Sequence, residues 1–295
     1  MEWQSRLIKV YLKVCDLWDQ GIWTSCQRFS SNQSKSLTDQ EAATIYVFGV
    51  MQGKMTIKEI HSFTKHFLPE WFPNLKNYEA FNHQLHQISD AFSVLVSKLI
   101  EDFQYLDFNQ EKVRILLDSF PISLAKNTRS AHAKVARELA DKGYCASKKM
   151  FYYGIKLHIA GFSQEKALPR PSVVGVTSAS CHDLKAFSSV ADKLKFCEVF
   201  ADKAYANKSL QNELKQKQQT DLITPIKKQK NQTFIDSADR FYSRAVSRIR
   251  QPIESLFNWL QEKTKIQIAS KVRSTKGLLI HVFGRLSAGL MMMKI

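Results

Sequence analysis

The segment Arg248-Ile-Arg-Gln-Pro-Ile-Glu254-Ser-Leu-Phe-Asn-Trp-Leu260 places a single carboxylate, Glu254, among arginines. Acidic residues are scarce around it, because residues 226–295 contain 14 Lys and Arg but only 4 Asp and Glu. Arg250 lies one helical turn before Glu254, so a salt bridge within a helix is the simplest explanation of this acid. The alternative is a metal ligand beside arginines that contact phosphates. The choice depends on whether the rest of the chain supplies partner carboxylates.

The composition favours a folded protein with a polyanionic partner. A chain of 295 residues, 44% of them hydrophobic, can build one large domain or one domain and a smaller one. The net charge of +16 favours nucleic acid as the partner, with a membrane surface second. No apolar run approaches the roughly 18 residues of a spanning helix, and the N-terminus lacks the order of a signal peptide. Five cysteines without a CxxC pair indicate reduced thiols in a cytoplasmic protein and no zinc site.

Residues 1–105 have the pattern of an all-helical domain. Apolar residues recur at helical spacing over 3–22 and again over 78–99. Between them, Thr38 and Glu41 form a capping box that starts a helix ending near Gly53, and Thr56 caps a second helix over 57–68. Two short helices joined by a tight turn and followed by a longer helix fit a helix-turn-helix-like DNA-binding domain. An ordinary helical bundle fits this pattern equally well.

The pattern changes to alternating strands and helices after residue 106. Strands are expected at 113–118, 152–159, 172–177, 198–202 and 221–225, and a basic, turn-rich loop at 124–150. Helices are expected from Asp183 to about 194, at 207–217, along an apolar stripe over 241–260, and at 276–293. Pro252 should kink the third of these helices or start a new one.

Three carboxylates occupy comparable positions in this order of elements. Asp118 ends the first strand, Asp202 ends the fourth, and Glu254 lies on the helix after the fifth. If the first and fourth strands are neighbours, both aspartates lie at the sheet edge where such folds place their sites. Three carboxylates so close together repel one another and need cations, which favours a site for two Mg²⁺ ions.

These residues resemble the bacterial insertion-sequence transposases of the DDE class. Asp118-Ser-Phe-Pro is similar to the first aspartate motif of that family, and Asp202-Lys-Ala-Tyr205 to the second. Arg250-x₃-Glu254 is similar to the centre of its Tyr-x₂-Arg-x₃-Glu-x₆-Lys signature, although Ser247 and Gln261 stand at the Tyr and Lys positions. The resemblance implies an α/β ribonuclease-H-like catalytic domain over 106–295, with a mixed five-stranded sheet and flanking helices.

The same resemblance implies a function. Asp118, Asp202 and Glu254 would be the catalytic residues and would bind Mg²⁺ or Mn²⁺. The enzyme would cut DNA at the terminal inverted repeats of a transposon and join the freed 3′-OH to target DNA. The DNA-binding residues would be Arg244, Arg248, Arg250, Lys263 and Lys265. Because two ends are joined, a homodimer on DNA is expected, and no membrane partner.

Two other functions remain open at this point, namely a non-catalytic DNA-binding relative and a nuclease of the same fold. The roles of some single residues are also open. Asp183 is either a helix N-cap or a fourth ligand. Trp259 either packs against the protein or stacks on an unpaired base. Phe257 is expected in the core, and Tyr205 is expected to order the loop after Asp202.

Overall fold

The computed structural model describes residues 2–27, 36–104, 113–146, 148–228, 232, 234 and 236–295. The chain forms two compact units. The helical unit comprises Met1–Asp102, Lys134–Glu138 and Leu260–Ile295, and the sheet unit comprises Phe103–Ala133 and Leu139–Trp259. The Ser-rich composition of residues 30–36 predicts a loop, and this segment apart from Ser36 lies outside the described residues. The predicted boundary after residue 105 also lies outside them.

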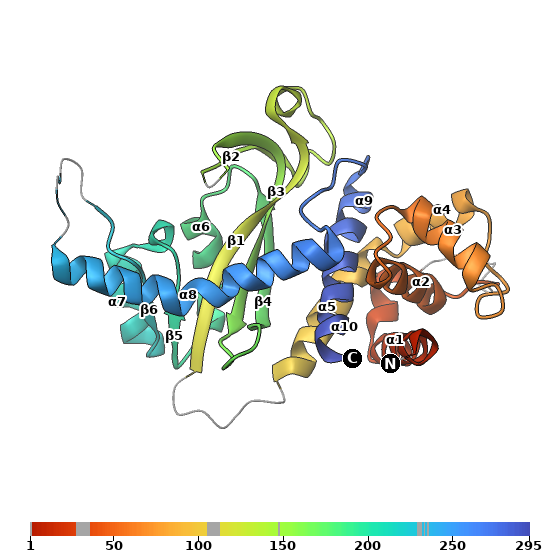
Figure 1. Cartoon of the computed structure of the whole chain (residues 1–295), viewed down its shortest axis with the longest axis horizontal. Helices are drawn as coiled ribbons and strands as arrows, with labels where there is room; N and C mark the ends of the chain where they lie inside the picture. Colours follow the sequence, from red (N-terminus) through yellow and green to blue (C-terminus); the bar gives the residue numbers. More distant parts are fainter. Residues whose placement is uncertain are drawn as a thin grey trace. The chain divides into compact units, whose positions relative to one another are not determined.

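The predicted helices of the first hundred residues are present in the helical unit (Figure 1). They are α1 (Trp3–Asp19), the short 3₁₀ helix η1 (Ile22–Cys26), α2 (Asp39–Met51), α3 (Ile57–Phe67), α4 (Tyr78–Gln87) and α5 (Ser89–Gln104). The capping box predicted at Thr38 and the cap predicted at Thr56 are confirmed, since each threonine accepts the backbone N–H of a glutamate three residues later. The single helix predicted over 78–99 is instead two helices that meet at Ile88.

Helix α2 forms the centre of the helical unit, because every residue from Ala42 to Val50 is buried. A helix that is buried all round needs neighbours on every side. Some of these neighbours come from the other end of the chain, in the π-helical turn η5 (Ile280–Gly284) and α10 (Arg285–Lys294), which follow α9 (Thr275–Leu279). The predicted catalytic domain over 106–295 therefore differs from the compact units, because Leu260–Ile295 packs with the helical part.

The sheet unit has the predicted mixed sheet, with the antiparallel and parallel pairs of a ribonuclease-H-like fold. The strands are β1 (Val113–Lys126), β2 (Asp141–Cys145), β3 (Met150–Phe162), β4 (Arg170–Ser178), β5 (Cys197–Phe200) and β6 (Asp221–Ile223). Their order is β2-β3-β1-β5-β6, and β4 also pairs with β3. The adjacency predicted for the first and fourth strands is confirmed, because β1 pairs in parallel with β5.

Two local predictions in this unit are wrong. Strand β1 does not end at Asp118 but continues to Lys126, paired with β3. The segment predicted as a loop over 124–150 contains the 3₁₀ helix η2 (Asn127–Ala131) and strand β2. Because of β2, the sheet has six strands instead of the predicted five. Strand β1 tolerates Pro121 because its pairing with β5 stops at Leu116, and a proline fits where one strand edge lacks a partner.

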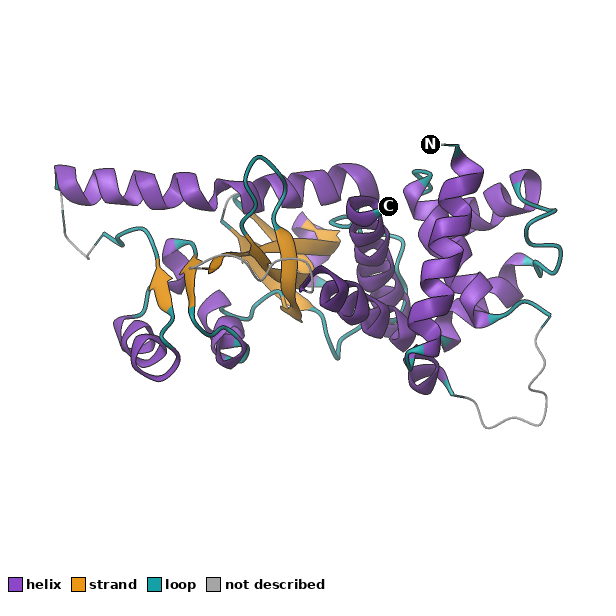
Figure 2. Ribbon diagram, turned by 90° about the horizontal axis from the view of Figure 1, so that it is seen from below, coloured by secondary structure: helices purple, strands orange, loops and turns teal. Residues whose placement is uncertain are grey.

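Helices cover both faces of the sheet (Figure 2). On one face, α6 (Asp183–Ser188), the 3₁₀ turn η3 (Ala191–Lys193) and α7 (Lys208–Gln218) enclose a core with Ile115 and Leu117 of β1. On the other face, α8 (Ser237–Thr264) contributes Phe257, whose ring centroid lies 4.5 Å from that of Phe120. Phe257 is buried, as predicted.

Helix α8 differs from its prediction in two respects. It continues without a break through Pro252, which therefore starts no new helix. The predicted apolar stripe is buried only in its second half, since Phe241 is exposed whereas Ile253 and Leu256 are buried. Across the described residues, no helix is both long and apolar enough to cross a membrane.

Candidate active site

The alternation of side chains along β1 places Asp118 on the face covered by α8. Ile115 and Leu117 point into the core below α6 and α7, so the even-numbered Asp118 and Phe120 point to the opposite face. Asp118 lies within its strand rather than at the end. However, β5 ends at Phe200, which pairs with Leu116, so Asp118 lies just beyond the carboxyl end of β5. The predicted edge of the sheet is therefore the correct one.

Asp202 follows the end of β5 by two residues and leads into the short helix η4 (Lys203–Tyr205). Its backbone carbonyl accepts the N–H of Tyr205 at 2.9 Å. Tyr205 is buried edge-on against Phe187, with ring centroids 5.9 Å apart, and so fixes this turn as predicted. Within the described part of the chain, the half-buried carboxylate of Asp202 makes no hydrogen bond or ion pair.

Arg250 connects the two other predicted acids. Its Nη1 donates to Oδ2 of Asp118 at 2.6 Å, and its Nη2 donates to Oε1 of Glu254. The salt bridge between Arg250 and Glu254 expected for a helix is therefore present, but it belongs to a larger arrangement that also includes β1. Nε of Arg250 is buried and has no hydrogen-bond partner among the described residues.

The carboxylates and the guanidinium influence one another's protonation. Burial raises the pKa of Asp118 to about 6, although Arg250 and the backbone N–H of Ser119 act in the opposite direction. The charge of Asp202 also raises this pKa, which places Asp202 within electrostatic range of Asp118. Burial lowers the pKa of Arg250, but the charges of Asp118, Glu254 and Asp202 outweigh burial and raise it. The structure thus brings the three predicted acids around one arginine.

The residue types suit a divalent ion, because hard cations such as Mg²⁺ prefer carboxylate oxygens. Among the described residues, no group of three or more His, Cys, Asp or Glu side chains is arranged to hold a metal. Arg250 pairs with both Asp118 and Glu254, so its guanidinium supplies the positive charge between these two carboxylates.

Asp183 does not cap its helix with its side chain, so the N-cap prediction is wrong. The N-cap of α6 is His182, and it makes no side-chain cap. The carboxylate of Asp183 instead accepts hydrogen bonds from Ser119 at 3.1 Å and from Lys156 at 3.0 Å. Lys156 was not a predicted site residue, although a lysine among the mostly apolar residues 150–159 is a signal that sequence reasoning could have used.

The predicted DNA-binding cations fall into both units. Arg244 and Arg248 are exposed on α8, whereas Arg250 is largely engaged with the two acids. Lys263 pairs with Glu262 at 3.0 Å, and Lys265 follows α8 in a left-handed conformation with φ of 54°. Trp259, the predicted packing or stacking residue, is half-buried.

A mixed sheet with acids at the edge of its central strands and on a covering helix defines a ribonuclease-H-like domain. The family described as transposase DDE domain matches residues 109–275 of the 295-residue chain. The match covers more than half of the chain and includes Asp118, Asp202 and Glu254, so the chain belongs to the DDE transposase family. Transposases of this family process DNA during transposition and generally use divalent metal ions. No curated protein matches the chain.

Proposed function

We propose that the chain is an insertion-sequence transposase that cuts the ends of its own DNA element and joins them to target DNA. Asp118, Asp202 and Glu254 would be its catalytic residues, and the reaction would be phosphodiester cleavage followed by strand transfer. The observation that carries the proposal is the pair of contacts from Arg250, which links β1 and α8 through two of the three acids.

The reaction conserves the number of phosphodiester bonds in its second step. In the first step, the oxygen of a water molecule attacks phosphorus, and the bond to the 3′ oxygen of the element end breaks. In the second step, that 3′ oxygen attacks a target phosphate, and one target strand is broken as the new bond forms. When bound by the three carboxylates, two divalent ions, Mg²⁺ or Mn²⁺, supply the positive charge that neutralises the scissile phosphate.

The residues of the site have distinct roles in this scheme. Arg250 holds Asp118 and Glu254 together while they carry no other cation, and it is released toward a DNA phosphate when the carboxylates are otherwise neutralised. Tyr205 keeps the turn of Asp202 fixed, because its ring is buried beside Phe187. Preorganised acids on a strand, a turn and a helix need little rearrangement during the reaction.

The cations provide the DNA-binding part of the proposal. Arg244 and Arg248 on α8, together with Lys263 and Lys265, would contact phosphates of the DNA. Helices α2 and α3 would act as the helix-turn-helix-like reader of the terminal inverted repeats. Since two ends are joined in one event, the active form would be a homodimer on DNA, and the protein would act in the bacterial cytoplasm on the nucleoid.

Cleavage and joining must be measured separately to test this function. A labelled duplex taken from the DNA that flanks the coding sequence is incubated with the full chain, a target plasmid and Mg²⁺. The wild type is expected to nick the duplex at one position and to transfer the labelled strand to the plasmid. Asp118→Asn should do neither, whereas Asp192→Asn, which removes an exposed acid of the same unit, should do both.

The outcomes distinguish the rival functions. Cleavage without transfer would favour a nuclease of the same fold. Tight binding of the ends without cleavage under any divalent metal would favour a non-catalytic relative. Cleavage by Asp118→Asn at the wild-type rate would remove the site assignment altogether.

A further inference from the structure

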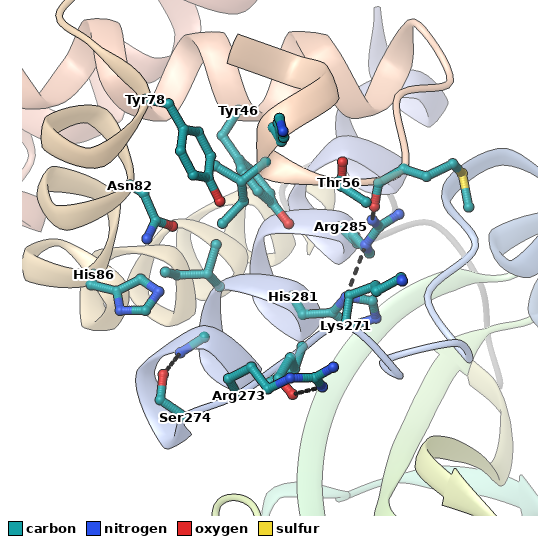
Figure 3. Close-up of a pocket in the computed structure, with 16 residues that line it drawn as sticks. Tyr46, Thr56, Tyr78, Asn82, His86, Lys271, Arg273, Ser274, His281 and Arg285 are labelled. Carbon is teal, nitrogen blue, oxygen red and sulfur yellow. Dashed lines mark hydrogen bonds between the residues drawn. The ribbon is translucent and has the colours of Figure 1, made fainter. Parts of the chain in front are cut away.

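A pocket of about 430 Å³ lies within the helical unit, and none of the three acids is among its lining residues (Figure 3). Its walls come from the turn between α2 and α3 with the first residues of α3, from one side of α4, and from the segment 271–285. Its volume falls in the range of about 300–1,000 Å³ that is typical of small-molecule sites. The proposed DNA cleavage does not use this pocket.

The pocket is cationic and lacks acids. Lys58, Lys271, Arg273 and Arg285 line it, and no Asp or Glu is among its lining residues. Burial lowers the pKa of His86, and the charge of Lys276 lowers it further. Within the described part of the chain, no carboxylate pairs with the four lining cations. Four unpaired positive charges around one cavity indicate an anionic ligand.

Arg285 is the most informative of these cations, because it is only 3% exposed. Its guanidinium donates to the backbone carbonyls of Thr264 and Met55 and to Nδ1 of His281, at 3.2 Å for the histidine. These acceptors are neutral. The Nε2–H of His281 donates to the carbonyl of Ile266 at 2.9 Å, so the ring is neutral and its Nδ1 is free to accept from Arg285. A buried cation without a counter-ion is costly, and a bound anion would compensate for its charge.

The remaining polar groups suit a planar partner. In Figure 3 the hydroxyl groups of Tyr46 and Tyr78 and the amide of Asn82 point into the pocket, beside the imidazole of His86. Tyrosine rings provide flat apolar surfaces for stacking, and an asparagine amide can bind the edge of a base. The pocket therefore combines groups that bind a phosphate with groups that bind an aromatic heterocycle.

We propose that this pocket binds one nucleotide, with its phosphate on Lys271, Arg273 and Arg285 and its base against Tyr78 and Asn82. A duplex is too wide for a cavity of this size, so the nucleotide is either free or part of an unpaired strand. DNA processing by the proposed function would supply unpaired strands, so the choice of a strand as the source of the nucleotide rests on that function. The contacts themselves do not depend on cleavage.

Binding of short probes tests the pocket in the full chain, without divalent metal and without an element end. The probes are fluorescein-labelled pentathymidylate, thymidine monophosphate, thymidine and inorganic phosphate. Lys271→Gln/Arg273→Gln removes two pocket charges, and Arg6→Gln/Lys9→Gln on α1 removes the same two residue types outside the pocket. Lys58→Gln is a second pocket variant on the exposed side of α3, where loss of folding is least expected.

The pocket variant is expected to bind pentathymidylate about tenfold more weakly than the wild type. The slope of the logarithm of its binding constant against the logarithm of salt concentration should be smaller in magnitude by about 1.4. The control variant should change affinity by less than about twofold, since cations outside the pocket contribute only a screened field. Tyr78→Leu should weaken binding of pentathymidylate, while Tyr78→Phe should retain it because the ring remains. Thymidine without phosphate should bind far more weakly than thymidine monophosphate.

Each other outcome has a defined meaning. An equal loss of affinity for pentathymidylate in the pocket and control variants would overturn the proposal. If inorganic phosphate bound as tightly as thymidine monophosphate, the proposed contacts of the base with Tyr78 and Asn82 would be overturned. Tighter binding of pentathymidylate than of the monophosphate identifies a strand as the source, and the reverse identifies a free nucleotide. If the chain binds the nucleotide but never cuts DNA, the pocket proposal stands and the proposed function is wrong. If the chain cuts DNA but its pocket variants bind the probes normally, the proposed function stands and the pocket proposal is wrong.

Discussion

Arg250 and Asp118 are 132 positions apart in sequence, yet Nη1 of the arginine lies 2.6 Å from Oδ2 of the aspartate. The same guanidinium also binds Glu254 on its own helix. One side chain thus positions a helix of the sheet unit against the strand that carries the first acid. The contact makes Arg250 a competitor of any metal ion that binds the same carboxylates.

The first prediction concerns the three acids as a set. Asp202→Asn and Glu254→Gln should lose cleavage to the same extent as Asp118→Asn, roughly 10²–10³-fold or more, because each change weakens charge stabilisation of the transition state. Any double variant should be little worse than a single one, since the residues act as a unit. Single-turnover cleavage of a labelled end measures this, and end binding should survive in every variant. Additive losses in the double variants would contradict a shared site.

The second prediction concerns the competition between Arg250 and metal. In Arg250→Gln, Mg²⁺ should raise the melting temperature more than it does in the wild type, because binding no longer displaces a guanidinium. Each tenfold gain in metal affinity adds about 1.4 kcal/mol of stability at saturating metal. Without metal the same variant should be less stable by about 1–3 kcal/mol, since the largely buried Asp118 loses its partner.

Arg248→Gln is the matched control for this measurement. It lies on the same helix and loses the same charge, but its side chain is exposed and contacts neither acid. Thermal melts with and without Mg²⁺ should show the wild-type metal effect in this variant. An identical metal effect in Arg250→Gln and Arg248→Gln would mean that the guanidinium does not compete with metal.

The third prediction concerns recognition of the element ends. Deleting residues 1–105 is a poor test, because α10 would lose its contacts with α2 and expose buried residues such as Leu290. Exposed residues of α3 are better targets, and Ser62→Ala/Lys65→Ala should reduce the preference for end DNA over random duplex. A lost base contact costs about 1–3 kcal/mol of discrimination. Competition binding measures the preference, and Lys9→Ala on α1 should leave it unchanged.

The fourth prediction concerns pH and His281, whose pKa burial and the neighbouring Arg285 lower to about 3. The ring is neutral in the folded chain, whereas in the unfolded chain it gains a proton below its ordinary pKa of about 6.5. Its contribution to stability is therefore complete above that pH and is lost as the pH falls from about 6.5 toward 3. The loss is about 1.4 kcal/mol per pH unit over this window.

Urea unfolding of the wild type and of His281→Gln at a series of pH values measures this effect. Glutamine cannot titrate, so the difference in unfolding free energy between the two proteins should shrink as the pH falls from 7 to 5. Other histidines are present in both proteins and cancel from the comparison. A constant difference over that range would show that His281 does not titrate between the two states.

Features set by short stretches of sequence were predicted well. The capping box at Thr38 and the cap at Thr56 depend on residues only a few positions apart, and both were found. The position of Glu254 on a helix and the mixture of strands and helices in the sheet unit also follow from local pattern, because apolar periodicity distinguishes helices from strands. The ribonuclease-H-like fold class was implied by the resemblance of the motifs to a known family. Tyr205 was correctly expected to fix the turn after Asp202.

Features set by distant pairing were not predicted. Strand β1 extends beyond Asp118 because β3 pairs with it as far as Lys126, and the residues around Ser119 do not predict this pairing. The bond between Asp183 and Lys156 joins residues 27 positions apart, so the sequence pattern suggested a helix cap instead. The pocket was missed for the same reason, since its cations come from the first turn of α3 and from residues beyond 270.

The packing of Leu260–Ile295 with the first hundred residues has a consequence for synthesis. Domains fold as they emerge from the ribosome, but α2 stays incompletely covered until the segment that contains η5 and α10 has been translated. The sheet unit, in contrast, has all of its residues once Trp259 has emerged. A nascent chain released at that point would contain all three acids without a finished helical unit. If the proposed roles hold, complete translation is a condition for coupling the proposed DNA cleavage in the sheet unit to the proposed recognition of element ends in the helical unit.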